Sequence, residues 1–124
     1  MITGYVNSNL DAMISLPVYG SQGLTHEIEA VIDTGYSGYL ALPSAIIATL
    51  GLSSVGLGYL TLADGSEVYS ALCAATIDWD GQERVIEVDS LETEALVGMA
   101  LMEGYDLGVR VKVGGRVTIR RYRK

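Results

Sequence analysis

The stretch Ile28-Glu29-Ala30-Val31-Ile32-Asp33-Thr34-Gly35 decides how this sequence is interpreted. Its apolar residues predict a strand that delivers a carboxylate into a turn carrying a hydroxyl and a glycine. Such a turn can hold a carboxylate partly out of water, and a partly desolvated carboxylate is useful for acid–base chemistry. An Asp-Thr-Gly taken alone is usually a turn capped by its own aspartate. Asp33 is therefore a candidate catalytic residue whose role depends on its context.

The chain on both sides of this stretch predicts β-strands joined by tight turns. Residues 11–18 and 27–32 are expected strands around a polar turn at residues 20–23. Three more hairpins are expected, with their turns at Ala63-Asp64-Gly65-Ser66, Asp80-Gly81-Gln82-Glu83 and Gly114-Gly115. In the last hairpin, the strand over residues 109–113 alternates valines with basic residues. The pattern predicts an all-β domain.

Two short helices are expected within this β pattern. Residues 43–50 have Pro43 near their start and Gly51 after their end, which is the usual polarity of helix signals. The second helix is expected over residues 98–103, up to Gly104. The methionines of the second segment are expected to pack in the core, since no Cys or His accompanies them to form a metal site.

The sequence also contains a weak internal repeat. The apolar run at residues 29–32 leads into Asp33 and Gly35, and a similar run at residues 94–97 leads into Gly98. Each run is followed by an expected helix. The repeat suggests an approximate two-fold arrangement within one small β domain.

Composition limits the class of protein. A length of 124 residues with 49% hydrophobic content predicts one folded domain over residues 1–124. The single cysteine, Cys73, cannot form an internal disulfide, so a reducing compartment is favoured and the cytoplasm is the expected location. No apolar run approaches the roughly 20 residues of a membrane span, and the start does not resemble a signal peptide. We expect no membrane partner, no metal and no cofactor.

The charges are placed unevenly along the chain. The formal net charge is −7, but basic residues gather in the last fifteen positions, at Arg110, Lys112, Arg116, Arg120, Arg121, Arg123 and Lys124. A basic segment of this kind can bind nucleic acid. Here the acidic remainder would repel phosphates, and no aromatic-rich basic groove is evident. We therefore expect a hairpin whose charges face water or the acidic body, and no nucleic-acid partner.

Together these features resemble the retropepsin-like aspartic proteases. The residues that carry the resemblance are Val31-Ile32-Asp33-Thr34-Gly35 with Leu40-Ala41-Leu42-Pro43, the turn Asp64-Gly65-Ser66, and Ala95-Leu96-Val97-Gly98. In that family an Asp-Thr-Gly strand, a flap hairpin, central strands and an apolar-apolar-glycine turn into a helix follow in the same order. The match covers roughly residues 25–108. It implies a small closed β-barrel with one or two short helices, and the C-terminal hairpin expected from the residues lies beyond the part that matches.

The resemblance assigns a role to each motif residue. It implies that Asp33 is the catalytic aspartate, that the Thr34 hydroxyl braces the active-site turns, and that Gly35 permits the backbone approach that orients Asp33. Substrate contacts are expected from Tyr36, Asp64, Gly65, Ser66, Val97 and Gly98. Tyr36 departs from the family pattern, which usually has Ala or Ser at that place, and it puts a bulky ring beside the active site.

The chemistry of the family has a structural consequence. It needs two close carboxylates that share a proton, because like charges at that distance cannot both ionise easily. This sequence has a single Asp-Thr-Gly, and Asp89-Ser90-Leu91 lacks the glycine. The second Asp33 is therefore expected from another copy of the chain, in a homodimer with one active site on its two-fold axis. The expected activity is hydrolysis of peptide bonds in an extended peptide or protein substrate.

Two other functions stay open at this point. The same fold and dimer can act as a catalytically silent peptide-binding or assembly module, with Asp33 kept as a turn carboxylate. Alternatively, the chain is a non-enzymatic barrel whose basic C-terminal segment docks an acidic partner.

Overall fold

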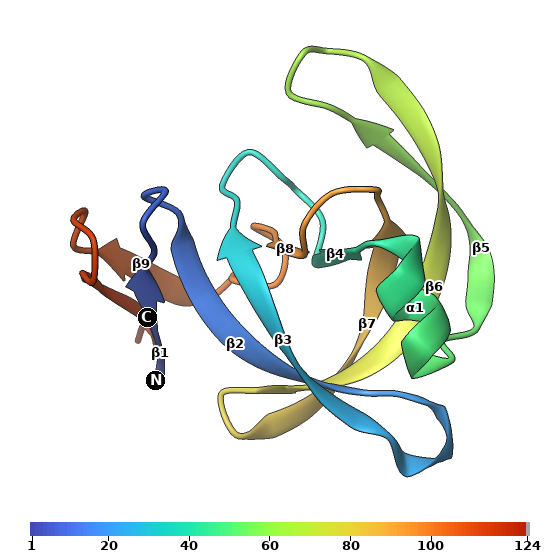
Figure 1. Cartoon of the computed structure of the whole chain (residues 1–124), viewed down its shortest axis with the longest axis horizontal. Helices are drawn as coiled ribbons and strands as arrows, with labels where there is room; N and C mark the ends of the chain where they lie inside the picture. The colour runs from blue at the N-terminus through green and yellow to red at the C-terminus, as the bar shows by residue number, and fades with distance from the viewer. Residues whose placement is uncertain (124) are drawn as a thin grey trace.

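The computed structural model describes residues 1–123, apart from the side chains of Leu60, Val68 and Ser70. Within this part, ten strands form one sheet in the order β5-β6-β7-β4-β8-β3-β2-β1-β10-β9 (Figure 1). The strands are β1 (Ile2–Val6), β2 (Ala12–Tyr19), β3 (Thr25–Ile32), β4 (Leu40–Leu42), β5 (Ser54–Thr61), β6 (Glu67–Trp79), β7 (Gln82–Ser90), β8 (Leu96–Val97), β9 (Tyr105–Val109) and β10 (Arg116–Arg121).

Part of the sheet closes into a barrel. The far end of β6 pairs with β2, where Val18 lies opposite Ile77 and Tyr19 opposite Thr76. Among the described strands, β6, β7, β4, β8, β3 and β2 thus form a ring. The short strands β4 and β8 pair antiparallel inside this ring, while β4 is parallel to β7 and β8 is parallel to β3. The predicted all-β closed barrel is confirmed.

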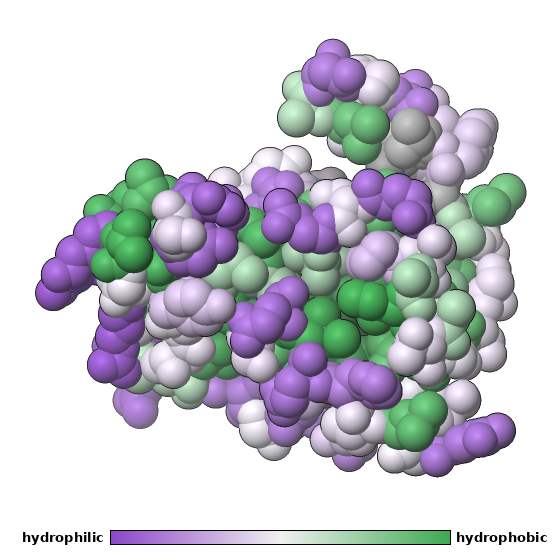
Figure 2. All heavy atoms as spheres, viewed as in Figure 1, coloured by the Kyte–Doolittle hydropathy of each residue, from purple (hydrophilic) through white to green (hydrophobic). Residues whose placement is uncertain are grey.

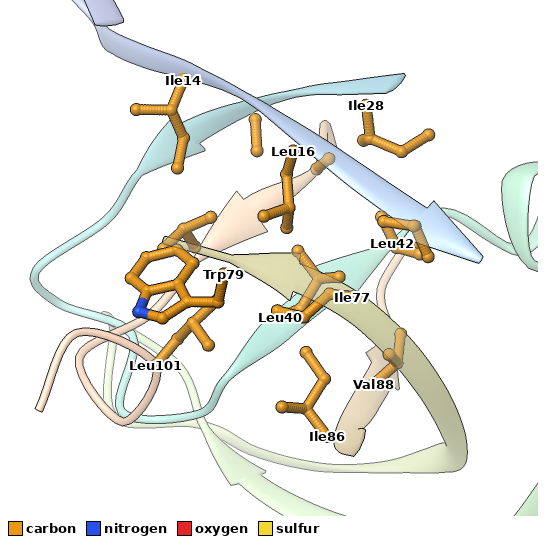
Figure 3. Packing of buried hydrophobic residues seen from close by; sticks show 14 of the residues in the cluster. Ile14, Leu16, Ile28, Leu40, Leu42, Ile77, Trp79, Ile86, Val88 and Leu101 are labelled. Carbon is orange, nitrogen blue, oxygen red and sulfur yellow. The ribbon is translucent and has the colours of Figure 1, made fainter. Parts of the chain in front are cut away.

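Alternation along the strands fills the barrel with aliphatic side chains. In β2, Ile14 and Leu16 are buried while Ser15 between them is exposed. Figure 3 shows these two side chains converging with those of Leu40, Ile77 and other residues of the ring. Each such buried side chain contributes roughly 1.5–3 kcal/mol of transfer free energy. This core fixes the strand ends that carry the candidate site.

Two predicted hairpins are confirmed with small changes. The β5–β6 hairpin places Thr61 opposite Glu67, as its turn residues predict. The β6–β7 turn is shorter than expected, because Trp79 pairs with Gln82 and only Asp80 and Gly81 remain in the turn. Both turn residues have positive φ, at 54° and 81°, which suits a two-residue hairpin.

The C-terminal hairpin differs from its prediction. β9 begins at Tyr105 and ends at Val109, opposite Val117, so residues 110–113 belong to a loop and not to a strand. The valines at positions 111 and 113 are exposed there. The loop is folded back because Gly114 donates its N–H to the Val6 carbonyl and Gly115 accepts from the Val6 N–H. The basic residues at positions 110–123 are all exposed, as expected, and Lys124 lies outside the described residues.

One of the two predicted helices is present. Helix α1 (Ser44–Leu50) begins after Pro43 and ends at Gly51, which has a φ of 66°. The helix expected over residues 98–103 is wrong, since the chain there forms consecutive turns. These turns are closed by the Met102 N–H, which donates to the Met99 carbonyl, and by the Tyr105 N–H, which donates to the Met102 carbonyl.

The β5–β6 hairpin extends beyond the body of the molecule. We call its free end, residues 57–71, the flap. Figure 2 shows it as a lobe that stands clear of the rest in the view of Figure 1. In the part of the chain that the structure describes, no helix is long and apolar enough to cross a membrane.

Candidate active site

Asp33 follows directly after β3, and the barrel fixes its backbone. Ile32 lies beside Val97 in the parallel β3–β8 pair, and the Asp33 N–H donates to the Val97 carbonyl at 2.9 Å. The Val97 side chain is buried in the core, so it supports this turn from behind and does not reach the surface of the chain. The Asp33 residue itself is half-buried.

The Asp33 turn (residues 33–36) is closed by its own hydrogen bonds. The Gly35 N–H donates to Oδ1 of Asp33 at 2.9 Å, and the Tyr36 N–H donates to the Asp33 carbonyl at 3.2 Å. A Cβ at Gly35 would lie 3.3 Å from the same Oδ1, so glycine leaves room for the carboxylate. Thr34 and Gly35 are exposed. The turn therefore orients one carboxylate oxygen and presents the hydroxyl of Thr34 to the outside.

Tyr36 and Asp89 form a buried pair behind the turn. Tyr36 is 8% exposed and Asp89 on β7 is 6% exposed. The Tyr36 hydroxyl donates to Oδ2 of Asp89. Burial, reinforced by this bond and by the charges of Asp89 and Glu87, raises the Tyr36 pKa far above its ordinary range. The pair thus connects the Asp33 turn to β7.

Gly98 allows a second turn to lie against the first. A Cβ at Gly98 would fall 2.2 Å from the Gly38 carbonyl oxygen and 2.7 Å from Cδ2 of Tyr36. Three successive N–H groups after β8 donate across this contact: Gly98 to the Tyr39 carbonyl, Met99 to that of Tyr36 and Ala100 to that of Gly38, at 2.8–3.1 Å. Glycine at this position is therefore needed for packing.

The tip of the flap repeats the local geometry of the Asp33 turn. Oδ1 of Asp64 accepts the Ser66 N–H at 2.9 Å and the Ser66 hydroxyl at 2.5 Å. These bonds, the hydroxyl foremost, lower the Asp64 pKa. Asp64, Gly65 and Ser66 are all exposed, and nothing lies within 4 Å of a Cβ at Gly65.

A hollow of about 100 Å³ lies between the Asp33 turn and the flap. Its walls come from both regions and from the chain around β8, at Asp33, Gly35, Tyr36, Thr61, Leu62, Ala63, Leu91 and Leu96. The flap contributes residues 61–63 to this wall, directly before the substrate contacts predicted at residues 64–66. Within this described lining, Asp33 is the one carboxylate.

A second hollow, of about 350 Å³, includes Asp89 in its wall. Its other lining residues follow Tyr36 or belong to β5, β6 and β7: Ser37, Gly38, Tyr39, Gly58, Tyr59, Leu72 and Glu87. Both hollows thus have flap residues in their walls, near the tip in the first and nearer the base in the second. In the described residues, no three His, Cys, Asp or Glu side chains gather as a metal-binding set.

Sequence reasoning found Asp33, Tyr36 and Gly98 but missed their surroundings. Leu62 and Leu91 lie in loops, where no alternation of buried and exposed residues indicates which side chains line a hollow. Asp89 was invisible for a different reason. It follows the buried Val88 in β7 and so reads as a solvent-facing residue, but the Tyr36 hydroxyl bonds to it and the residue is buried.

Comparison with known proteins gives a match of fold. No protein-family model and no curated protein matches the sequence. Among solved structures, a retropepsin-like aspartic protease from Rickettsia conorii is similar, with a TM-score of 0.60 and 20% identity. The match covers 96% of this chain and 89% of that one. The chain therefore has a retropepsin-like fold.

Proposed function

We propose that this chain is an aspartic endopeptidase that acts as a homodimer, with Asp33 of each subunit in one shared active site. The observation that carries the proposal is the half-buried Asp33 carboxylate, held by the Gly35 N–H at one wall of a hollow that the flap also lines. The retropepsin-like fold and the similarity to an aspartic protease support it.

The proposed chemistry needs a second carboxylate, and the surface around Asp33 has room for it. Asp33 is the one carboxylate among the described residues that line its hollow. Thr34 is exposed beside it, in a position to meet the same residue of a partner. An isologous contact across a two-fold axis would bring two Asp33 turns together and complete the site.

In such a site the two carboxylates divide the work. One is ionised and acts as general base on a water molecule, which then attacks the scissile carbonyl carbon. The other is protonated and donates a hydrogen bond to the carbonyl oxygen, where negative charge develops. The Gly35 N–H holds one carboxylate oxygen in place, so the orientation of the base does not have to be found during the reaction.

The substrate is proposed to be an extended peptide. One hollow lies between residues 33–36 and flap residues 61–63, and the other between residues 37–39 and flap residues 58 and 59, so a strand-like ligand can place separate side chains in the two hollows. Backbone hydrogen bonds to strand edges provide affinity in this mode of recognition, and the side-chain hollows provide selectivity.

The test compares two aspartates with the same local geometry. Asp33→Asn is expected to reduce cleavage of an unstructured peptide library by at least about 10³-fold, because no general base remains. Asp64→Asn is the matched control, since its carboxylate also accepts an N–H two residues ahead but lies at the exposed flap tip. Cleavage is measured by mass spectrometry, folding by circular dichroism and assembly by sedimentation.

The outcomes separate the alternatives. Wild-type turnover that is lost in Asp33→Asn, with fold and dimer intact, supports the proposal, as does a bell-shaped dependence of turnover on pH. Turnover retained in Asp33→Asn, or a strict monomer at high concentration, contradicts it. Binding of extended peptides without cleavage at any pH would favour a peptide-binding module.

A further inference from the structure

A second polar feature lies away from the Asp33 turn, around the indole of Trp79. Trp79 is the last residue of β6 and is 1% exposed. Its Nε1 is buried and has no hydrogen-bond partner among the described residues. Buried N–H groups are paired in the great majority of native structures, so each exception calls for an explanation. The Trp79 donor is therefore a place to look for a ligand.

The ring nitrogen points away from one part of the aliphatic core. Figure 3 shows the nitrogen on the side of the indole away from Leu16, Leu40 and Ile77. Tyr105 packs against the ring edge to face, with ring centroids 5.7 Å apart. The apolar part of Trp79 is thus used in packing, and its polar edge is not.

Trp79 lines a cavity of about 240 Å³. The cavity is formed where β6, β7, β9 and β10 meet, and its other polar and aromatic walls are Gln82, Arg84, Glu103, Tyr105 and Arg121. These residues are brought together by pairing, since Trp79 lies opposite Gln82 and Tyr105 opposite Arg121. The position is therefore set by the sheet and not by a mobile loop.

Hydrogen-bond donors dominate this cavity. The side chains supply an indole N–H, a primary amide and the guanidinium groups of Arg84 and Arg121. Among the described residues neither guanidinium is in an ion pair, and Arg84 makes one long bond, 3.4 Å, to the Leu101 carbonyl. Glu103 is the one carboxylate of the lining and is exposed. The lining has a net positive charge inside an otherwise acidic protein.

We propose that this cavity binds a small oxyanion, a carboxylate or a phosphate group, through the Trp79 indole N–H and the guanidiniums of Arg84 and Arg121. Arginine is suited to this role because its planar fork meets two oxygens of a carboxylate or phosphate at once. The indole donor adds a bond that a non-specific basic surface lacks. The proposal is independent of the proposed proteolytic activity, because Asp33 takes no part in it.

The chain provides its own reporter for the test. Trp79 is the single tryptophan, so fluorescence excited at wavelengths that tyrosine does not absorb reports on this cavity. The intact protein is titrated with sodium phosphate in one arm and sodium acetate in another, with sodium chloride at matched ionic strength as the reference. A saturable change in emission is expected in at least one oxyanion arm and not with chloride. The arm that saturates at lower concentration identifies the preferred group.

Neighbouring arginines on β10 give a matched pair of variants. Arg121→Gln removes a guanidinium from the cavity and is expected to weaken binding about tenfold. Arg120→Gln makes the same change in charge at the next residue, which does not line the cavity, and is expected to bind as the wild type does. Both side chains are exposed, so neither variant threatens the fold.

Four results would overturn the proposal. The first is a response that rises linearly with oxyanion concentration, and the second is one that chloride reproduces. The third is an equal loss in Arg120→Gln and Arg121→Gln, which would indicate general attraction to the basic hairpin. Trp79→Phe, followed by calorimetry in place of fluorescence, gives an independent check, because it keeps an aromatic ring but removes the indole donor. Unchanged affinity in a folded Trp79→Phe protein would also contradict the proposal.

Discussion

The Asp33 turn and the tip of the flap have nearly the same local structure. In each, an aspartate Oδ1 accepts the backbone N–H two residues ahead at 2.9 Å, and a glycine lies in the turn. They differ in what lies behind them. The Asp33 turn is backed by a buried tyrosine, by Gly98 and by β8, whereas a Cβ added at Gly65 in the Asp64 turn would meet open space. A motif of three residues does not distinguish these sites, but the packing behind it does.

The difference in packing predicts that a Gly→Ala substitution is tolerated less well behind the Asp33 turn than at the flap tip. Gly98→Ala places a methyl group 2.2 Å from a backbone oxygen of the Asp33 turn region, so the two turns must separate. We expect a loss of about 3 kcal/mol in the free energy of unfolding, at the upper end for overpacking. Gly65→Ala meets open space and is strained only by its φ of 86°, with an expected loss of about 1 kcal/mol. Urea denaturation measures the free energy of unfolding of both variants, and equal losses would contradict the proposed difference in packing.

The two regions also each contain a tyrosine–carboxylate hydrogen bond. Tyr36 donates to the buried Asp89, and Tyr59 donates to Glu67 on the exposed flap. Tyr36→Phe keeps the ring but removes one bond from a buried carboxylate, and is expected to cost about 1–3 kcal/mol of stability. Tyr59→Phe is expected to leave the denaturation midpoint unchanged, because water replaces the lost bond.

If the Tyr36 bond also positions the Asp33 turn, Tyr36→Phe reduces kcat of the proposed peptidase more than it changes KM. A Tyr36→Phe protein as stable as the wild type would show that the hydrogen bond between Tyr36 and Asp89 does not stabilise the Asp33 turn.

The same buried bond predicts how stability depends on alkaline pH. Burial and the bond to Asp89 raise the Tyr36 pKa above its ordinary value of 10.0. The unfolded chain therefore ionises this tyrosine first, so its contribution to stability is complete below about pH 10 and is lost as the pH rises further. Thermal unfolding between about pH 8 and about pH 11 should show a smaller decline in Tyr36→Phe than in the wild type. An identical decline would mean that Tyr36 ionises alike in both states.

The smallest effect is expected at the flap tip. The Ser66 hydroxyl is the main cause of the lowered pKa of Asp64, so Ser66→Ala should raise that pKa toward its ordinary value. A lowered pKa stabilises the folded state above the ordinary pKa of the carboxyl and loses this effect as the pH falls below it. Because the site is exposed, the change should be visible in an NMR titration of Asp64 and not in global unfolding. A shift in the opposite direction would contradict the assigned hydrogen bond.

Much of the fold was predictable because its signals are local. Alternating residues predicted β2 and β3, glycine turns predicted the β5–β6 and β6–β7 hairpins, and Pro43 and Gly51 predicted the limits of α1. The closure of the barrel followed only from family resemblance. It depends on pairs such as Val18 with Ile77, which are distant in sequence and have no local signature.

The errors share a physical cause. The missing helix at residues 98–103 has reasonable helix-forming residues, but the N–H groups of residues 98–100 bond to carbonyls of residues 36–39. The valines at 111 and 113 alternate as a strand should, yet Gly114 and Gly115 bond to Val6 and pull the segment into a loop. In both places a long-range pairing overrode a local preference. The same holds for the site. The Asp33 turn was predicted, but Asp89, which accepts the Tyr36 hydroxyl behind the turn, was not.

The pairing of β1 with β10 has a kinetic consequence. Ile2 lies opposite Ile119, so one of the first segments of this sequence to be synthesised completes its hydrogen bonds with one of the last. Contacts of such high sequence separation slow folding, because a long loop must be closed before the hydrogen bonds between β1 and β10 can form. Until β10 is available, β1 keeps an open edge that can pair with other chains. The order in which the polypeptide emerges therefore delays the pairing of β1 with β10, whereas the ring of strands closed by β6 and β2 does not have to wait for β10.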